Sequence, residues 1–231
     1  MLHIAEGILP AQWALAWYGV ASVAVARGLR ELRRREREGQ GLRPVLGLMG
    51  AAIFIISLLP VPVPVAGTSA HAAGTPLAAI LLGPWLSTLL AAASLLLQAL
   101  FFAHGGITTW GANILSEGLV GSLVAFGVFR FLRGRGASLG GAAAAAGFIG
   151  DLAVYVMSSF ELALALHGSK PVLTVMAAIF AAYLPAQGPL AVGEAMLTAG
   201  VLRYILGQRP DILYNLGVIS RTHPGVKEEP V

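Results

Sequence analysis

The chain has 231 residues, of which 57% are hydrophobic and only 11% are charged, against about 25% charged residues in an ordinary soluble domain. Its net charge of +4 comes from short basic blocks between apolar segments, which argues against a nucleic-acid partner. The absence of cysteine excludes disulfides, Fe–S clusters and cysteine zinc sites. This composition is typical of a membrane protein with several spanning helices.

Seven apolar segments predict an all-α integral membrane protein, a bundle of about seven transmembrane helices. They run over residues 8–26, 45–63, 75–87, 87–103, 113–132, 138–166 and 172–206. The third and fourth adjoin at Gly83-Pro84-Trp85. We expect residues 1–206 to form a single transmembrane domain and residues 207–231 to form a cytoplasmic tail. No basic residue precedes the first segment, so it is not expected to be a secretory signal.

The basic residues predict the orientation in the membrane. Fourteen of the 15 Lys and Arg residues lie at or beyond the end of the first, fifth or seventh segment, and only Lys170 lies on the other side. Basic residues concentrate in cytoplasmic loops, so we expect an outer N-terminus, a cytoplasmic C-terminus and a cytoplasmic basic loop at residues 27–44. The expected location is the plasma (inner) membrane, crossed several times.

The first ten residues, Met1 to Pro10, form a candidate metal-binding segment. A free amino terminus with His3 in third place offers the terminal amine of Met1, the backbone amides of Leu2 and His3, and the imidazole ring. These four nitrogens close fused chelate rings in one plane, a geometry that suits Ni(II) or Cu(II). The alternative is that a histidine stands near the chain start by chance.

The expected orientation gathers histidines at the outer face. His3, His71, His104 and His167 all fall there, whereas His223 lies in the cytoplasmic tail. A group of outer histidines around a free N-terminus predicts an entry site for a divalent metal ion, with His71 as a further ligand. The alternative is that these are ordinary loop histidines.

Two loops rich in Gly, Pro, Ser and Thr, residues 61–75 and 104–113, frame this predicted site. Polar neighbours that hydrogen-bond a ligand fix its orientation and tautomer. The candidates for that role are Ser69, His104, Thr108 and Asn113. Ordinary turns would explain the same loop residues.

Four carboxylates lie inside the predicted spans, where ionisable groups are costly and usually face the bundle interior: Glu117, Asp151, Glu161 and Glu194. Glu117 shares a helix face with Asn113 and Ser116. These groups form either a polar path for a cation or hydrogen bonds between helices, and for Asp151 and Glu194 we favour the second interpretation. Residues 140–147, nearly all Gly or Ala, predict a close helix contact or a smooth docking surface.

Motifs for several enzyme classes are missing from the sequence. There is no Gly-x-x-x-x-Gly-Lys-Ser/Thr loop, no His-Glu-x-x-His and no Gly-x-Ser-x-Gly. The chain is therefore not expected to bind a nucleotide or to be an enzyme, and transport is the simplest prediction. The alternatives are a stand-alone divalent-cation carrier driven by protons through Asp151 and Glu194, and an intramembrane hydrolase using Ser158.

Six motifs together resemble the CbiM/NikM family, the substrate-capturing components of energy-coupling factor transporters for cobalt or nickel. The resemblance runs from about residue 3 to residue 206. The motifs are His3-Ile4-Ala5-Glu6-Gly7-Ile8-Leu9-Pro10, Gly67-Thr68-Ser69-Ala70-His71-Ala72-Ala73-Gly74, Leu81-Leu82-Gly83-Pro84-Trp85, Leu96-Leu97-Gln98-Ala99-Leu100, His104-Gly105-Gly106 with Gly111-Ala112-Asn113, and Gly150-Asp151-Leu152-Ala153.

The resemblance implies an extracytoplasmic N-terminus plugged into the bundle, with Met1, His3 and His71 holding Co(II) or Ni(II) as the transported substrate. It also implies a transmembrane coupling (T) protein, a pair of ATPase (A) subunits and often a small accessory membrane protein. Glu6-Gly7 and Leu9-Pro10 look more like the cobalt members. The family's near-terminal histidine is usually residue two, whereas Leu2 intervenes here. Because the amine, two amides and the His3 ring could already fill four positions, His71 would lie either in the plane of the ligands or axial to it.

Overall fold

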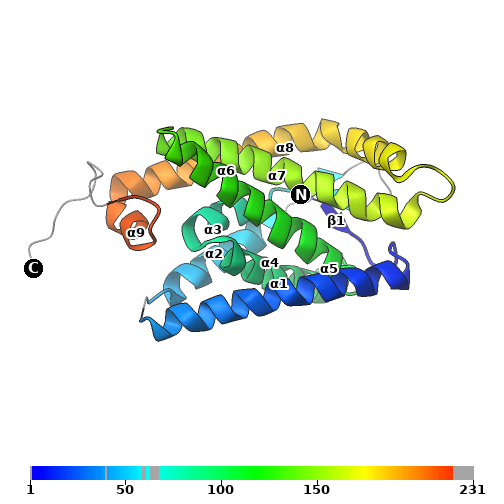
Figure 1. The fold of residues 1–231 in the computed structure, drawn as a ribbon, viewed down its shortest axis with the longest axis horizontal. Coiled ribbons are helices and arrows are strands. Elements are labelled where there is room, and N and C mark those ends of the chain that lie inside the picture. The colour runs from blue at the N-terminus through cyan, green and yellow to red at the C-terminus, as the bar shows by residue number, and fades with distance from the viewer. Residues whose placement is uncertain (1, 40, 59–60, 63–67, 221–231) are drawn as a thin grey trace, which may run out of the picture.

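The computed structural model describes residues 2–39, 41–58, 61–62 and 68–220, which form an elongated bundle of helices (Figure 1). The helices are α1 (Ala11–Arg37), α2 (Arg43–Ser57), α3 (Thr75–Leu82), α4 (Pro84–Phe101), α5 (Trp110–Asn113), α6 (Ser122–Gly134), α7 (Leu139–Leu166), α8 (Val172–Gln208) and α9 (Pro210–Asn215). A π-helical segment, Ile114–Gly121, joins α5 to α6. The strands β1 (Leu2–Ile4), β2 (Val61–Pro62) and β3 (Thr68–Ala70) form a small antiparallel sheet in the order β1-β3-β2.

The all-α class predicted from the sequence is confirmed, and the helices follow the apolar segments closely. The expected break at Gly83-Pro84-Trp85 is present, because Gly83 has a φ of +85° and Pro84 starts α4. The expected boundary at residue 87 was therefore wrong by a few residues.

Helix α1 is longer than the apolar segment that predicted it. It continues through the first part of the expected basic loop and ends at Arg37. Glu31 accepts from Arg34 and Arg35, each at 2.7 Å, and pairs of this spacing stabilise an exposed helix. These ion pairs allow the helix to continue past its apolar part.

Four helical stretches of the described chain are long and apolar enough to cross a membrane: Pro84–Phe101, Trp110–Gly134, Leu139–Leu166 and Val172–Gln208. Helix α2 is apolar but has 15 residues, and at about 1.5 Å per residue it is shorter than the hydrocarbon core of a bilayer. The total of about seven crossings and the orientation of the termini remain predictions.

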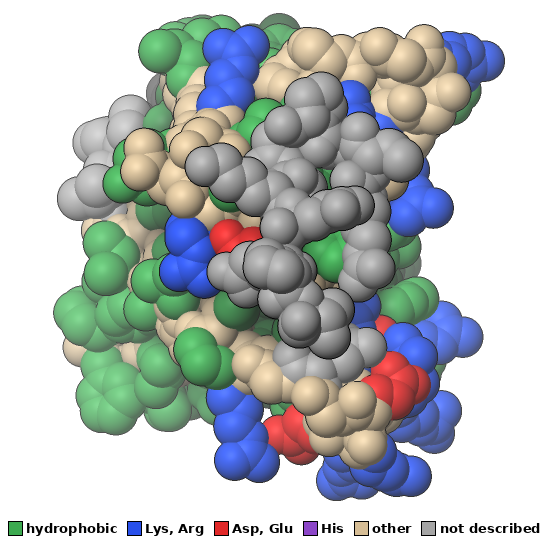
Figure 2. All heavy atoms as spheres, turned by 90° about the vertical axis from the view of Figure 1, so that its left-hand side faces the viewer, with side chains coloured by type: hydrophobic (Ala, Val, Ile, Leu, Met, Phe, Trp, Pro, Cys, Tyr) green, Lys and Arg blue, Asp and Glu red, His purple; other side chains and the backbone are tan. Residues whose placement is uncertain are grey.

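Basic side chains gather at one end of the molecule. Figure 1 places α9 and the C-terminal end of α1 together at this end, and the turn between α7 and α8 at the opposite end. Figure 2 looks at the first of these ends and shows Lys and Arg side chains around it, beside a large apolar flank. This separation agrees with the predicted cytoplasmic side.

Small residues bring the long helices together. A Cβ added to Gly147 on α7 would lie 2.8 Å from the carbonyl oxygen of Glu194 on α8, and one added to Gly150 would lie 2.7 Å from the Cβ of Ala125 on α6. Of the two expectations for residues 140–147, the close helix contact is therefore found at Gly147. Glycine at these positions lets backbones approach without a void.

A similar contact fixes the loop that carries residues 104–113. A Cβ on Gly111 in α5 would lie 2.6 Å from the backbone nitrogen of Tyr18 and 2.8 Å from the carbonyl carbon of Trp17, both on α1. Because both neighbours are backbone atoms, they cannot rotate away. Gly111 therefore sets the distance between α1 and the end of this loop.

We expect Gly111→Ala to lower the free energy of unfolding by about 1–3 kcal/mol, because the added methyl group forces α5 away from α1. Thermal unfolding of the purified chain in detergent measures the change. The matched control is Gly127→Ala on α6, where an added Cβ meets no atom within 4 Å of it. Equal unfolding temperatures for the two variants would contradict this account of Gly111.

Candidate metal centre

The small sheet brings the start of the chain beside the His71 loop. In the pairing of β1 with β3, Leu2 lies opposite Ala70, His3 opposite Ser69 and Ile4 opposite Thr68. His3 therefore lies next to the strand that leads directly into His71. Met1 and the side chains of Leu2 and Ser69 fall outside the described part of the structure, so their predicted roles stay predictions.

Side chains of the 104–113 loop hold the backbone of the first strand. The Ile4 N–H donates to Asn113 Oδ1 at 2.9 Å, and the Ile4 carbonyl accepts from Thr109 Oγ1 at 2.6 Å and from Asn113 Nδ2 at 3.2 Å. An edge strand inside an apolar bundle needs such partners, because buried backbone groups without hydrogen bonds are costly. Asn113 was predicted to bond a histidine ring; in the structure it bonds the backbone beside His3.

Thr108 also holds the N-terminal segment, at Glu6 and Gly7, just after β1. Its N–H donates to Glu6 Oε2 at 3.0 Å, and its hydroxyl accepts from the Gly7 N–H at 3.4 Å. Thr108 was also predicted to bond a histidine ring, and the structure directs it to the chain after β1 instead. The Glu6 carboxylate and the Gly7 N–H thus take the bonds of Thr108.

Three histidines from three separate segments form one cluster. The ring centroids of His3 and His71 are 4.4 Å apart, those of His3 and His104 are 4.4 Å apart, and those of His71 and His104 are 5.1 Å apart. One ring nitrogen from each lies within 4.8 Å of the others, close enough to share a metal ion. His104, predicted as a neighbour of the ligands, thus lies among them. His167 lies apart, its Nδ1 3.1 Å from the Lys170 carbonyl.

Hydrogen bonds leave one specific nitrogen free on each of the two buried rings. His3 Nε2 lies 3.1 Å from Glu117 Oε2, and His71 Nδ1 lies 2.9 Å from the Ala72 carbonyl. Within the described residues, His3 Nδ1 and His71 Nε2 are buried and have no hydrogen-bond partner. A ring that donates one N–H to an oxygen presents the other nitrogen as an acceptor, which is the arrangement of metal-binding histidines. The unpartnered atoms are therefore suitable for a metal ion.

Glu117 is the functional candidate that the sequence did not identify at this site. It lies in the π-helical segment Ile114–Gly121, and π-helical turns are frequent at functional sites. The hydroxyl of Thr88 donates to the Gly118 carbonyl at 2.9 Å within this turn. The available signal was an ionisable residue in a span on the same face as Asn113, but its contact with His3 depends on where the N-terminal strand inserts.

Glu194 holds the far side of the His71 loop. Its carboxylate accepts from the Ala73 N–H at 2.8 Å and from the Gly74 N–H at 3.1 Å, at the start of α3. A carboxylate at a helix N-terminus is favourable because it meets unsatisfied N–H groups and the positive end of the helix dipole. The contact supports the structural interpretation of Glu194 over a role in proton movement.

Burial keeps the clustered histidines neutral. The three lie in β1 and in loops, outside the membrane-spanning helices. Loss of hydration on burial lowers the pKa of His3 to about 3 and that of His104 to about 4, and it lowers the pKa of His71 well below its usual value. A neutral imidazole is the form that binds a metal ion, so the cluster is ready to bind at neutral pH.

Known proteins resemble this chain over nearly its whole length. The family described as "CbiM: Cobalt uptake substrate-specific transmembrane region" matches residues 3–212. A cobalt transport protein CbiM of Sorangium cellulosum is 43% identical over 224 residues, which cover 97% of this chain and 99% of that protein. A protein of the same name from Geobacter sulfurreducens is 44% identical over 224 residues, and the match spans 97% of this chain but 65% of that longer protein.

Solved structures show the same fold. The crystal structure of a truncated transition metal transporter superposes with a TM-score of 0.78 at 26% identity, covering 88% of this chain and 98% of that one. A second transition metal transporter, 23% identical, has the same TM-score of 0.78 and agrees in fold. The resemblance seen in the sequence motifs is confirmed, and the chain belongs to the CbiM family of cobalt uptake substrate-specific transmembrane proteins.

Proposed function

We propose that this chain is the metal-specific membrane component of an ATP-driven energy-coupling factor importer in the plasma membrane, and that it captures Co(II) at its outer end. The observation that carries the proposal is the pair of buried, unpartnered ring nitrogens, His3 Nδ1 and His71 Nε2, in one cluster with His104. Metal uptake by the relatives that share its family supports the same conclusion.

The free nitrogen on His3 is the one that chelation requires. Nδ1 can close a six-membered ring through a metal ion with the residue's own amide nitrogen, whereas Nε2 points too far from the backbone. With the amine of Met1 and the amide of Leu2, this set would supply four nitrogens. His71 Nε2 would then add a nitrogen from the loop that follows β3. His104, which is only partly buried, would lie between the metal ion and the solvent.

Cobalt is proposed over nickel because the curated relatives are named cobalt transport proteins. At a site made of nitrogen ligands alone, the Irving–Williams order favours Ni(II) over Co(II). Selection of cobalt therefore has to come from the positions of the ligands and from metal supply. The narrow cluster of three rings, each held by a separate segment, is suited to impose such positions.

Transport is proposed to depend on a transmembrane coupling (T) protein, ATPase (A) subunits and, in some assemblies, a small accessory membrane protein. The sequence carries no phosphate-binding loop of its own. The rival, a proton-coupled carrier, is not favoured because Glu194 is engaged with the amides of Ala73 and Gly74. Cobalt uptake by cells should stop when the ATPase subunits are deleted, and uptake at the full rate would exclude this coupling.

Titration of the purified chain with Co(II) and Ni(II), followed by visible absorption, tests the metal site directly. We expect a ligand-field band that is lost when residues are added before Met1. We also expect His71→Ala to lower the metal affinity at least ~10-fold, because removing a ligand should cost no less than removing a residue that hydrogen-bonds a ligand. His167→Ala is the matched control outside the cluster. Tight binding that survives the extension but fails in His71→Ala would move the site to His71 and His104 alone.

Replacing the carboxyl group of Glu117 by an amide should weaken the site without removing a ligand. We expect Glu117→Gln to lower Co(II) affinity by about 10-fold, because the amide holds the His3 ring less firmly and makes it a poorer donor. The absorption band should shift as well, which a general loss of stability would not produce. Glu161→Gln is the control, since Glu161 is as buried but has no hydrogen bond to the three histidines. Equal affinities in the two variants would dismiss the role of Glu117.

The pH dependence of binding should reflect the amine and the backbone amides and not the imidazoles. Because burial lowers the pKa of His3 to about 3 and that of His104 to about 4, protons compete for these rings only in strong acid. The terminal amine, with an ordinary pKa of about 7.7–8.0, must lose a proton on binding, and so must each backbone amide that coordinates the ion. Affinity should therefore fall steadily as the pH is lowered, with no added steepness near pH 6.5. A steeper fall there, measured by the same titration, would contradict the buried, neutral rings.

A further inference from the structure

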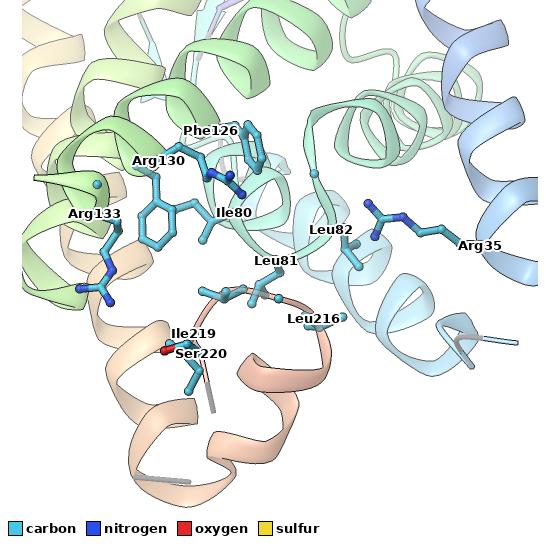
Figure 3. A pocket seen from close by; sticks show the side chains of 15 residues that line it. Arg35, Ile80, Leu81, Leu82, Phe126, Arg130, Arg133, Leu216, Ile219 and Ser220 are labelled. Carbon is cyan, nitrogen blue, oxygen red and sulfur yellow. The ribbon is translucent and has the colours of Figure 1, made fainter. Parts of the chain in front are cut away.

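A second site lies at the basic end of the molecule, away from the histidines. It is a pocket of about 600 Å³ between the end of α3, the second half of α6 and the segment that follows α9 (Figure 3). Helix α3 separates it from the metal centre: the helix starts at Thr75, shortly after His71, and its last residues, Leu81 and Leu82, line the pocket. The pocket plays no part in the proposed capture of metal.

The charged side chains among the described residues that line this pocket are all basic. Arg35 on α1 and Arg130 on α6 extend toward each other from opposite sides, and Arg133 adds a third guanidinium on the α6 side (Figure 3). No Asp or Glu is among the described residues that line it. The pocket therefore presents concentrated positive charge to whatever enters.

Two of these three arginines, Arg130 and Arg133, have no carboxylate partner among the described residues. Arg35 Nε donates to Glu31 at 2.7 Å, and Arg133 Nη1 donates to the Ala137 carbonyl at 2.7 Å. Arg130 lies over the ring of Phe126, 5.7 Å from its centroid, and has no carboxylate partner in the described part of the chain. An arginine stacked on an aromatic ring keeps its N–H groups available for an anion.

Most of the remaining lining is apolar and includes Leu82, Phe126, Leu216 and Ile219. A pocket lined by both arginines and hydrocarbon matches an amphiphile, in which an anionic group is joined to an apolar body. A small free anion would leave the apolar wall in contact with water.

The outer surface of α6 continues this apolar wall toward the bilayer. Leu123 is 41% exposed and Phe131 is 59% exposed on the helix that carries Arg130 and Arg133. Exposed side chains of this kind on a membrane protein contact acyl chains. An anionic group held by the arginines can therefore remain joined to chains that lie along α6.

We propose that this pocket binds the phosphate-bearing headgroup of an anionic phospholipid from the leaflet at the basic end. Arginine guanidinium groups bind phosphate oxygens with paired hydrogen bonds, and basic pockets between spanning helices are suited to such headgroups. The apolar wall takes the glycerol backbone and the start of the acyl chains. The bound lipid fixes the ends of α1, α3 and α6 relative to one another.

The test compares lipid binding by purified full chains in detergent, using native mass spectrometry with phosphatidylglycerol and with phosphatidylcholine of the same acyl chains. The pocket variant is Arg130→Gln with Arg133→Gln. The control is Arg43→Gln with Arg209→Gln, which removes two exposed arginines outside the pocket; their side chains are 85% and 66% exposed. Unfolding temperatures without lipid check that each variant is folded, and the single variant Arg130→Gln, for which about 5-fold weaker binding is expected, replaces the pocket variant if it is not.

We expect the wild-type chain and the control to retain phosphatidylglycerol over phosphatidylcholine, and the pocket variant to bind phosphatidylglycerol about 10-fold or more weakly, since each arginine near an anionic headgroup contributes about 1 kcal/mol. Undiminished binding by the pocket variant would overturn the proposal. Displacement of the lipid by millimolar inorganic phosphate would show a free-phosphate site in its place. Lipid binding only after removal of residues 221–231 would assign the pocket to the chain's own tail. Either result would also overturn it.

Discussion

The cluster depends on one constraint: a short strand inserted among helices must find hydrogen-bond partners for its backbone. Ile4 finds them in Asn113 and Thr109, which satisfy both its N–H and its carbonyl. The side of the strand that faces β3 pairs within the sheet. Because backbone groups without partners are costly in an apolar interior, these bonds determine both where the strand lies and how far it enters. The position of His3 follows from them, and the rings of His71 and His104 lie beside it.

Two carboxylates then position the rings from opposite sides. Glu117, in the π-helical turn, meets the ring of His3, while Glu194 on α8 holds the amides of Ala73 and Gly74 just after His71. Glu117 orients the side chain of His3, and Glu194 holds the backbone that follows His71. The unpartnered nitrogens belong to these two histidines, which lie in one cluster. Buried carboxylates are expensive in a membrane protein, and here each is engaged with a group that it orients. Glu117 and Glu194 are thus part of the support for the histidine cluster.

The sequence predicted the helices well because apolar length and glycine-proline breaks are local signals. The break at Gly83-Pro84 is present in the structure. The bounds of the long segments 138–166 and 172–206 lie within a few residues of the ends of α7 and α8. It did not predict the π-helical turn, because one extra residue in a turn leaves little trace in hydrophobic periodicity. It also could not assign Asn113 and Thr108 to backbone partners, or bring Glu117 to His3, since those contacts depend on how a strand from the chain start packs against residues more than a hundred positions away. His104 was recognised as part of the region, but its place inside the cluster required the fold.

The attachment of the first strand has a consequence for how its sequence can vary. The side-chain bonds that fix the strand act on His3, on Ile4 and on residues after it, such as Glu6 and Gly7. Leu2 is held by its pairing with Ala70 in the sheet. Codons added ahead of Met1 would therefore lengthen the chain before β1 and leave the ring of His3 where it is. The position of the His3 ring is thus independent of how many residues precede the strand.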